Sequence, residues 1–147
     1  MINFKINSWK SPYTFIEDWE DIVDKYSSNV ALQFEDTKYT FKEVNEKINQ
    51  ISNWAIKNAK FQRGSVVALI MKNRPEFVFT WLAMAKIGVI TALINTNLHG
   101  ISLEHVLKVS GAQILIYGSE VEQLLYGIDY SNIFKDWSIY YFDGTQK

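Results

Sequence analysis

Apolar positions in the first third of the chain follow a helical spacing in two places. Residues 15–26 place one set on a single face: Phe15, Trp19, Ile22, Val23 and Tyr26. A second stretch, which starts after Thr40, does the same with Phe41, Val44, Ile48, Ile51 and Ala55. A glutamate follows a threonine by three positions at both starts, as in a capping box: Thr14 with Glu17, and Thr40 with Glu43. The pattern predicts two helices, the second with a buried stripe, separated by a hairpin over residues 30–40 that turns at residues 35–37.

From residue 64 onward, short apolar runs alternate with helical stretches. The runs predict strands at residues 66–71, 89–94, 114–117 and 139–142. Helices are predicted at residues 75–87, opened by Pro75, from Ser102 to near Gly111, and after Ser119, where Glu122 completes a cap. Strands that are apolar throughout are buried on both faces, as in a parallel sheet with helices on each side. The predicted fold is α/β, with a small N-terminal β-hairpin.

One apolar stretch raises the alternative of a membrane span. Residues 77–94 carry a single charge, Lys86. A spanning helix needs about 20 apolar residues, and here the charge lies in mid-run beside Gly88, after which β-branched residues dominate. A buried helix followed by a buried strand fits this stretch better than a transmembrane helix.

Composition narrows the class of protein. The chain has 147 residues, of which 48% are hydrophobic, so it can form one domain or a part of one. The formal net charge is −1 and the cationic residues are scattered, which argues against a nucleic acid partner. There is no cysteine, which excludes disulfides, thiolate metal sites and cysteine nucleophiles and fits an intracellular protein. The first ten residues lack the apolar run of a secretory signal.

The sequence lacks the common motifs of nucleotide binding and acyl transfer. It contains no G-x-G-x-x-G after a strand, no G-x-x-x-x-G-K-[ST] loop and no G-x-S-x-G elbow. Two polar loops do follow predicted strands, at residues 73–76 and 95–97, where open α/β sheets bind ligands. The loop at residues 73–76 has two interpretations. In the functional one it binds an anion at the start of a helix, and in the structural one Asn73 or Arg74 caps that helix. The loop Asn95-Thr96-Asn97 either lines a ligand cleft or uses its side chains to form hydrogen bonds with its own backbone.

Histidines and paired aromatic residues give weaker signals. A metal site needs three or four convergent ligands, which two histidines six positions apart across a helix start do not supply. Surface or capping roles are therefore expected for His99 and His105. The i,i+4 pairs Phe77/Trp81 and Trp54/Asn58 are more typical of packing than of a ligand site.

The middle of the chain resembles a known family. Residues 64–77, GSVVALIMKNRPEF, are similar to the "GDVVALxxxNxPEF" segment of AMP-forming acyl-activating enzymes, and residues 81–88 continue the likeness. Residues 92–98, ALINTNL, resemble the branch of very-long-chain acyl-CoA synthetases and fatty acid transport proteins. That branch is also matched by Ser102-Leu103, His105, Ser110-Gly111-Ala112 and Gly118-Ser119-Glu120. The resemblance covers residues 13–122, and Val44 departs from the family's leucine.

The resemblance implies an activity that these residues do not complete. The family makes an acyl-adenylate from a fatty acid with ATP and magnesium and then transfers the acyl group to coenzyme A. Its phosphate loop, ribose-binding acid, magnesium glutamate and C-terminal lysine would all follow residue 147. We therefore expect residues 1–147 to be the N-terminal part of an AMP-dependent synthetase domain, with no catalytic, cofactor-binding or metal-binding residue of its own. Fatty acid and the remainder of the synthetase are the expected partners.

Two other functions stay open at this stage. The chain would be a non-catalytic module that binds fatty acid or a partner, or a stand-alone regulatory domain of the flavodoxin type. For the full-length protein, the resemblance implies a cytoplasmic location or peripheral association with the cytoplasmic side of the endoplasmic reticulum, peroxisomal or plasma membrane.

Overall fold

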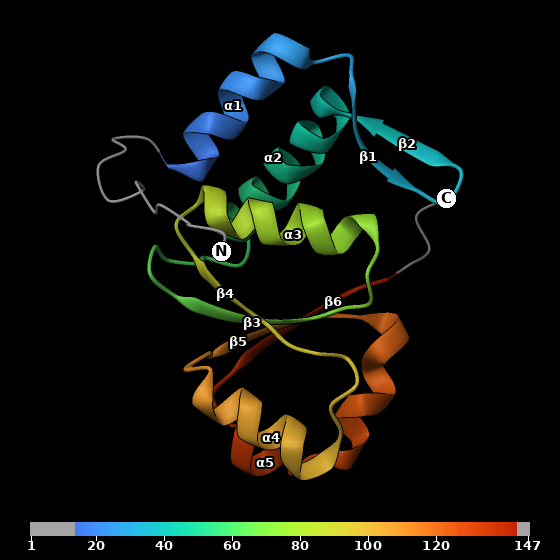
Figure 1. Ribbon diagram of the computed structural model, residues 1–147. Coiled ribbons are helices and arrows are strands. Elements are labelled where there is room, and N and C mark those ends of the chain that lie inside the picture. Colours follow the sequence, from blue (N-terminus) through green and yellow to red (C-terminus); the bar gives the residue numbers. More distant parts are fainter. Residues whose placement is uncertain (1–13, 144–147) are drawn as a thin grey trace, which may run out of the picture. The chain divides into compact units, whose positions relative to one another are not determined.

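A computed structural model describes residues 14–143 of the chain (Figure 1). The chain divides into two compact units, residues 1–45 and 46–147. The first holds helix α1 (Phe15–Tyr26) and strands β1 (Val30–Phe34) and β2 (Thr37–Thr40). Helix α2 (Phe41–Lys57) runs from the first unit into the second, and the remaining elements belong to the second. The expected α/β class with a small hairpin is confirmed.

The first unit contains the predicted elements, and its helix α1 is mostly exposed. Thr14 and Glu17 form the expected capping box, and β1 pairs with β2 in antiparallel register. Within α1, Val23 alone is buried, whereas Phe15 is 60% exposed and Ile22 and Tyr26 are also exposed. The apolar stripe of α1 is therefore present but mostly uncovered. A unit made of one helix, one helix start and a two-stranded hairpin offers little apolar surface to cover that stripe.

The second predicted capping box sets the start of α2. The Glu43 N–H donates to Thr40 Oγ1 at 3.2 Å, and the Thr40 N–H donates to Glu43 Oε2 at 2.8 Å. These bonds favour the charged carboxylate, so Thr40 holds the pKa of Glu43 below its usual range.

The capping box gives a testable pH dependence. Because the folded-state pKa of Glu43 is lowered, its contribution to stability is present above the unfolded pKa and is lost as pH falls through the folded pKa. We expect Glu43→Gln to flatten the loss of stability below about pH 4.5. Urea unfolding midpoints measured across that range check this. Asp36→Asn in the β1–β2 turn is the control, and an equal flattening there would count against the cap.

The second unit is built on a four-stranded parallel sheet. Its strands are β3 (Val66–Ile70), β4 (Ile90–Leu93), β5 (Ile114–Gly118) and β6 (Ser138–Phe142), and their order is β4-β3-β5-β6. Numbered by their position along the chain, the four strands stand in the order 2-1-3-4. The chain adds β4 on one side of β3, and then adds β5 and β6 on the other side. All four predicted strands are present, with ends shifted by one residue or less.

Strand β4 differs from the prediction of burial on both faces. It lies at the edge of the sheet, and Ile90 and Leu93 are 58% and 47% exposed. The N–H groups of Ile90 and Ile94 donate to the carbonyls of Ser65 and Leu69, respectively. The N–H groups of Thr91 and Leu93, which alternate with them, therefore point away from β3. No strand of the described residues pairs with that outer side. An apolar run alone does not tell an edge strand from a central one.

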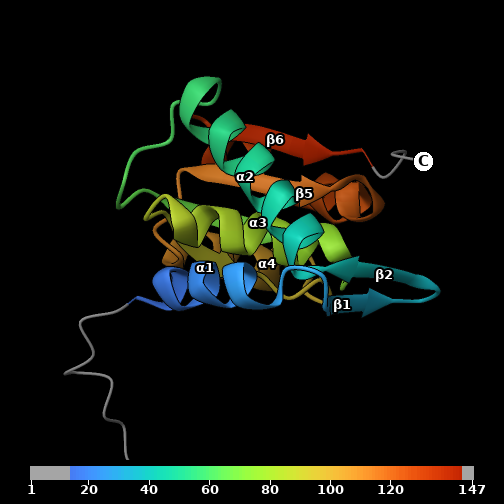
Figure 2. The same cartoon turned by 90° about the horizontal axis from the view of Figure 1, so that it is seen from above.

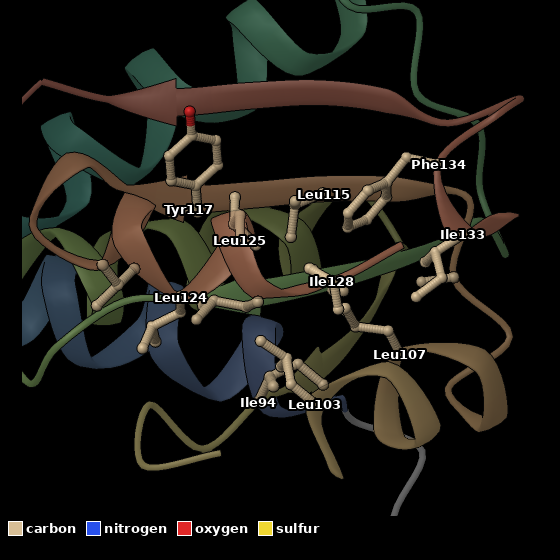
Figure 3. Close-up of a cluster of buried hydrophobic side chains, with 14 residues drawn as sticks. Ile94, Leu103, Leu107, Leu115, Tyr117, Leu124, Leu125, Ile128, Ile133 and Phe134 are labelled. Carbon is tan, nitrogen blue, oxygen red and sulfur yellow. The ribbon is translucent and has the colours of Figure 1, made fainter. Parts of the chain in front are cut away.

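A hydrophobic core of the second unit lies on one face of the sheet (Figure 3). Alternate residues of the central strands, Ala68 and Ile70 of β3 with Leu115 and Tyr117 of β5, point to this face. Three helical elements cover it, as Figure 1 shows: α4 (Gly100–Val109), the 3-10 helix η2 (Ser119–Gly127) and α5 (Tyr130–Ile133). They contribute a fully apolar set of side chains: Leu103, Leu107, Val121, Leu124, Leu125 and Ile133.

The opposite face of the sheet is covered by α3 (Pro75–Lys86) and by the part of α2 from Glu46 onward (Figure 2). These helices are joined where the buried Ser52 hydroxyl donates to the Ala83 carbonyl at 3.2 Å. Trp54 of α2 packs edge-on against Phe61 and Tyr140, with ring centroids 5.8 and 5.0 Å away. The expected packing role of Trp54 is confirmed, although its partners lie on other elements and not at Asn58.

Some predicted helix boundaries need correction. Helix α4 begins at Gly100, two residues before the predicted start at Ser102, with His99 in the extended N-cap position. Ser119 does not cap η2. Gly118 holds that position without a side-chain bond, and Glu122 accepts from the Tyr117 hydroxyl at 3.5 Å instead. The short α5 was not predicted.

The apolar stretch at residues 77–94 forms most of α3 followed by β4, as predicted. Within the described residues, no helix combines the length and the apolar character needed to cross a membrane.

Candidate functional site

The two polar loops singled out in the sequence lie together at one edge of the sheet. The loop after β3 supplies Met71, Lys72 and Asn73, and the loop after β4 supplies Asn95, Thr96 and Asn97. With Phe77, Leu93 and Ile94 they line an open groove of about 630 Å³. The carboxyl ends of neighbouring parallel strands meet at one edge, which is where open α/β sheets bind ligands. We take this groove as the candidate site.

The groove combines apolar walls with amide groups. Met71, Phe77, Leu93 and Ile94 provide apolar surface, and three asparagines and a threonine provide hydrogen-bonding groups. Lys72 is the single charged residue among those that line it. Such a lining suits a ligand that carries amide, hydroxyl or anionic groups on an apolar body.

Part of the polar lining is engaged with its own backbone. The Asn97 N–H donates to Asn95 Oδ1 at 2.9 Å, which closes a turn at the start of the loop. The local structural interpretation of Asn95 is therefore correct. Its loop also lines the cleft that the alternative interpretation predicted, so both hold for this segment.

A second polar cluster lies between the ends of β3 and β5. Chain order reverses between these strands, so this is the topological switch point of the sheet. The Lys72 N–H donates to Glu120 Oε1 at 2.9 Å, and Arg74 Nη1 lies 3.4 Å from Glu120 Oε2. Arg74 Nε also lies 3.5 Å from Glu76 Oε2. The side chains of Arg74 and Glu120 are 16% and 23% exposed, so the pair is mostly shielded from water.

Gly118 makes room for the Glu120 carboxylate. A Cβ added at Gly118 would overlap both carboxylate oxygens, so a residue with a side chain would displace Glu120 from this position. No sequence motif indicated Glu120 as a site residue. The signal that could have found it is a glycine two residues before a glutamate, at the end of a central strand.

The cluster bears on the two interpretations of residues 73–76. Arg74 is the N-cap residue and Pro75 the first residue of α3, as the capping interpretation predicted, but the Arg74 side chain makes no cap bond. The guanidinium instead pairs with Glu76 and Glu120. In this structure the carboxylates that face Arg74 belong to the chain itself, and the anion-binding interpretation stays a prediction.

The remaining candidates do not form a site. His99 and His105 are exposed, in agreement with the expected surface roles. Phe77 lines the groove, and Trp81 is 41% exposed. Within residues 14–143, no cluster of three or more His, Cys, Asp or Glu residues could hold a metal ion.

The donors that a nucleotide would need are already engaged at the switch point. A triphosphate needs several N–H donors and a cation held by oxygen ligands. The donors at the switch point, the Lys72 N–H and Arg74, already face the Glu120 carboxylate.

Comparisons with known proteins place this fold among adenylating enzymes. Residues 19–133 match the family model described as AMP-binding enzyme. The long-chain fatty acid transport protein 6 of Mus musculus is 31% identical over 107 residues, which cover 68% of this chain and 17% of that protein. The crotonobetaine/carnitine–CoA ligase of Citrobacter koseri is 34% identical over 107 residues, which cover 69% of this chain and 20% of that protein.

A solved structure extends the likeness over almost the whole chain. The anthranilate CoA ligase AuaEII, in complex with anthranoyl-AMP, superposes with a TM-score of 0.81 at 25% identity. The superposition covers 97% of this chain and 28% of that protein. The chain thus spans under a third of this protein and about a fifth or less of the two curated relatives.

Proposed function

Because this chain belongs to the family of AMP-binding enzymes, we propose that it forms the first part of a fatty acyl-CoA synthetase. The family match over residues 19–133 carries the proposal. The reaction would join a long or very long chain fatty acid to coenzyme A, with ATP and magnesium used to form an acyl-adenylate. Other parts of the whole enzyme would supply the nucleotide and metal ligands.

The names of the relatives support this reaction at two levels. Two of them are CoA ligases, for crotonobetaine or carnitine and for anthranilate, so joining a carboxylic acid to coenzyme A is a recurrent activity in this group. The finer assignment to long-chain fatty acids follows the long-chain fatty acid transport proteins of mouse and human. The polar and apolar groove supports a share in ligand binding for this segment.

We propose further that residues 1–147 alone have no ligase activity. Adenylation needs the phosphates of ATP aligned against the carboxylate by fixed donors and a cation. Among the described residues, Arg74 and the Lys72 N–H come nearest to such a set of donors. The positive charge of Arg74 is already balanced by the carboxylates of Glu76 and Glu120.

The direct test is acyl-adenylate formation by the purified chain. We expect no ATP-dependent activation of a long-chain fatty acid above the level without protein, while the crotonobetaine/carnitine–CoA ligase of Citrobacter koseri, assayed on its own substrate, is the positive control. Turnover proportional to the concentration of this chain would overturn the prediction.

A chimera tests the assignment to the synthetase itself. Residues 19–133 of this chain replace the corresponding segment of the crotonobetaine/carnitine–CoA ligase of Citrobacter koseri, and we expect ligase activity to be retained. The matched control carries Leu93→Asp in the groove, which should lower activity without unfolding the chimera. A well-folded chimera that is inactive would argue against the proposed role and favour a binding module.

The whole protein would act at a membrane surface on the cytoplasmic side. The support is the family of transport proteins to which the relatives belong. Flotation of the full-length protein with vesicles, with and without anionic lipid, measures this association.

A further inference from the structure

We propose that Glu120 is an internal ligand that fills the oxyanion position at the switch point of the sheet. In open α/β sheets this crevice is where external ligands bind. Here the Lys72 N–H and the Arg74 guanidinium face the two carboxylate oxygens of a residue that comes from the far side of the crevice. The assignment does not depend on which ligand the groove takes.

The chemistry of the position suits a small oxyanion. A backbone N–H and a guanidinium are the donor types that hold carboxylate and phosphate groups in proteins. Arg74 also has unused donor capacity, because its Nη2 atom is buried and donates no hydrogen bond within the described residues, while its Nε lies 3.5 Å from Glu76 Oε2 without a hydrogen bond. Glu120 Oε2 is likewise buried without a hydrogen-bond donor and is held by charge alone. An oxyanion that replaced the carboxylate would therefore find at least as many donors.

The internal ligand has a consequence for the groove. Lys72 lies between Met71 and Asn73, and all three line the groove. By holding the Lys72 amide, Glu120 fixes the course of the loop after β3 and so the position of that wall. We infer that Glu120 is a positioning residue: it shapes the groove without being among the residues that line it.

A gain of phosphate binding tests the proposal. The 147-residue chain is compared with Glu120→Ala by ¹⁵N–¹H NMR during titration with inorganic phosphate. In the wild type, we expect no saturable shift of the Lys72 amide. In Glu120→Ala, the amide should exchange with solvent about 10- to 100-fold faster, the loss expected for a hydrogen bond to a charged group. Phosphate should then shift the Lys72 signal saturably and restore part of its protection.

Two variants make the outcome decisive. The double variant Arg74→Gln with Glu120→Ala should show no saturable shift, because the guanidinium is gone. If Glu120→Ala does not fold, Glu120→Gln keeps the shape and removes the charge, and its Lys72 amide should exchange about tenfold faster than in the wild type. The proposal is overturned if phosphate leaves the Lys72 amide of folded Glu120→Ala unchanged, or if Glu120→Gln protects that amide as well as glutamate does.

Discussion

Replacing Leu107 with alanine is expected to lower the free energy of unfolding by about 2 to 5 kcal/mol. Leu107 is fully buried on the inner face of α4, among the side chains that fill the space between the sheet and η2 (Figure 3). The substitution removes apolar contacts and leaves a cavity that the surrounding helices fill only in part. Urea denaturation of the purified chain measures the loss as a lower midpoint with an unchanged slope.

The matched control lies on the same helix. Val109 is 66% exposed, so Val109→Ala removes little buried surface and should change stability by less than about 0.5 kcal/mol. A similar loss of stability in both variants would contradict the burial of Leu107 and the exposure of Val109.

Replacing Gly118 with alanine is expected to release Glu120 from the Lys72 amide. The added Cβ would occupy the space of the carboxylate, and the flexible glutamate side chain would swing out rather than distort the strand. The Lys72 amide should then exchange about 10- to 100-fold faster, as in Glu120→Ala. Hydrogen exchange resolved by residue measures this directly, and the fold itself should persist.

Gly127 offers the control for this prediction. It lies at the end of η2, and an added Cβ would meet no atom within 4 Å. Gly127→Ala should leave the Lys72 amide protected. If Gly118→Ala also leaves it protected, Glu120 can hold the loop from another position, and the glycine is not required.

Much of the local structure could be predicted from the sequence because its causes are local. The capping boxes at Thr14 and Thr40 depend on residues three positions apart, and the structure contains both. Pro75 opens α3 as predicted because its ring suits a first helical residue. The apolar runs gave all four strands of the parallel sheet.

Features that depend on distant residues could not be predicted in the same way. Ile90 and Leu93 belong to an apolar run like that of β3, and only the order of strands makes β4 an edge. The partner of Arg74 lies 46 positions along the chain, at Glu120, which no spacing rule would indicate. The groove was half predicted: both loops were singled out, but their convergence depends on β3 and β4 being neighbours.

The order of the strands also has a consequence for the synthesis of the chain. Strand β3 is made before β4, and these neighbours can pair while the rest is still being translated. The other side of β3 must wait for β5, because Val67 pairs with Ile114. Until then the apolar Ala68 and Ile70 have none of the cover that η2 and α5 later give them. Long-range parallel pairing is slow, so a nascent chain in this state exposes apolar surface and is prone to aggregate unless chaperones bind it.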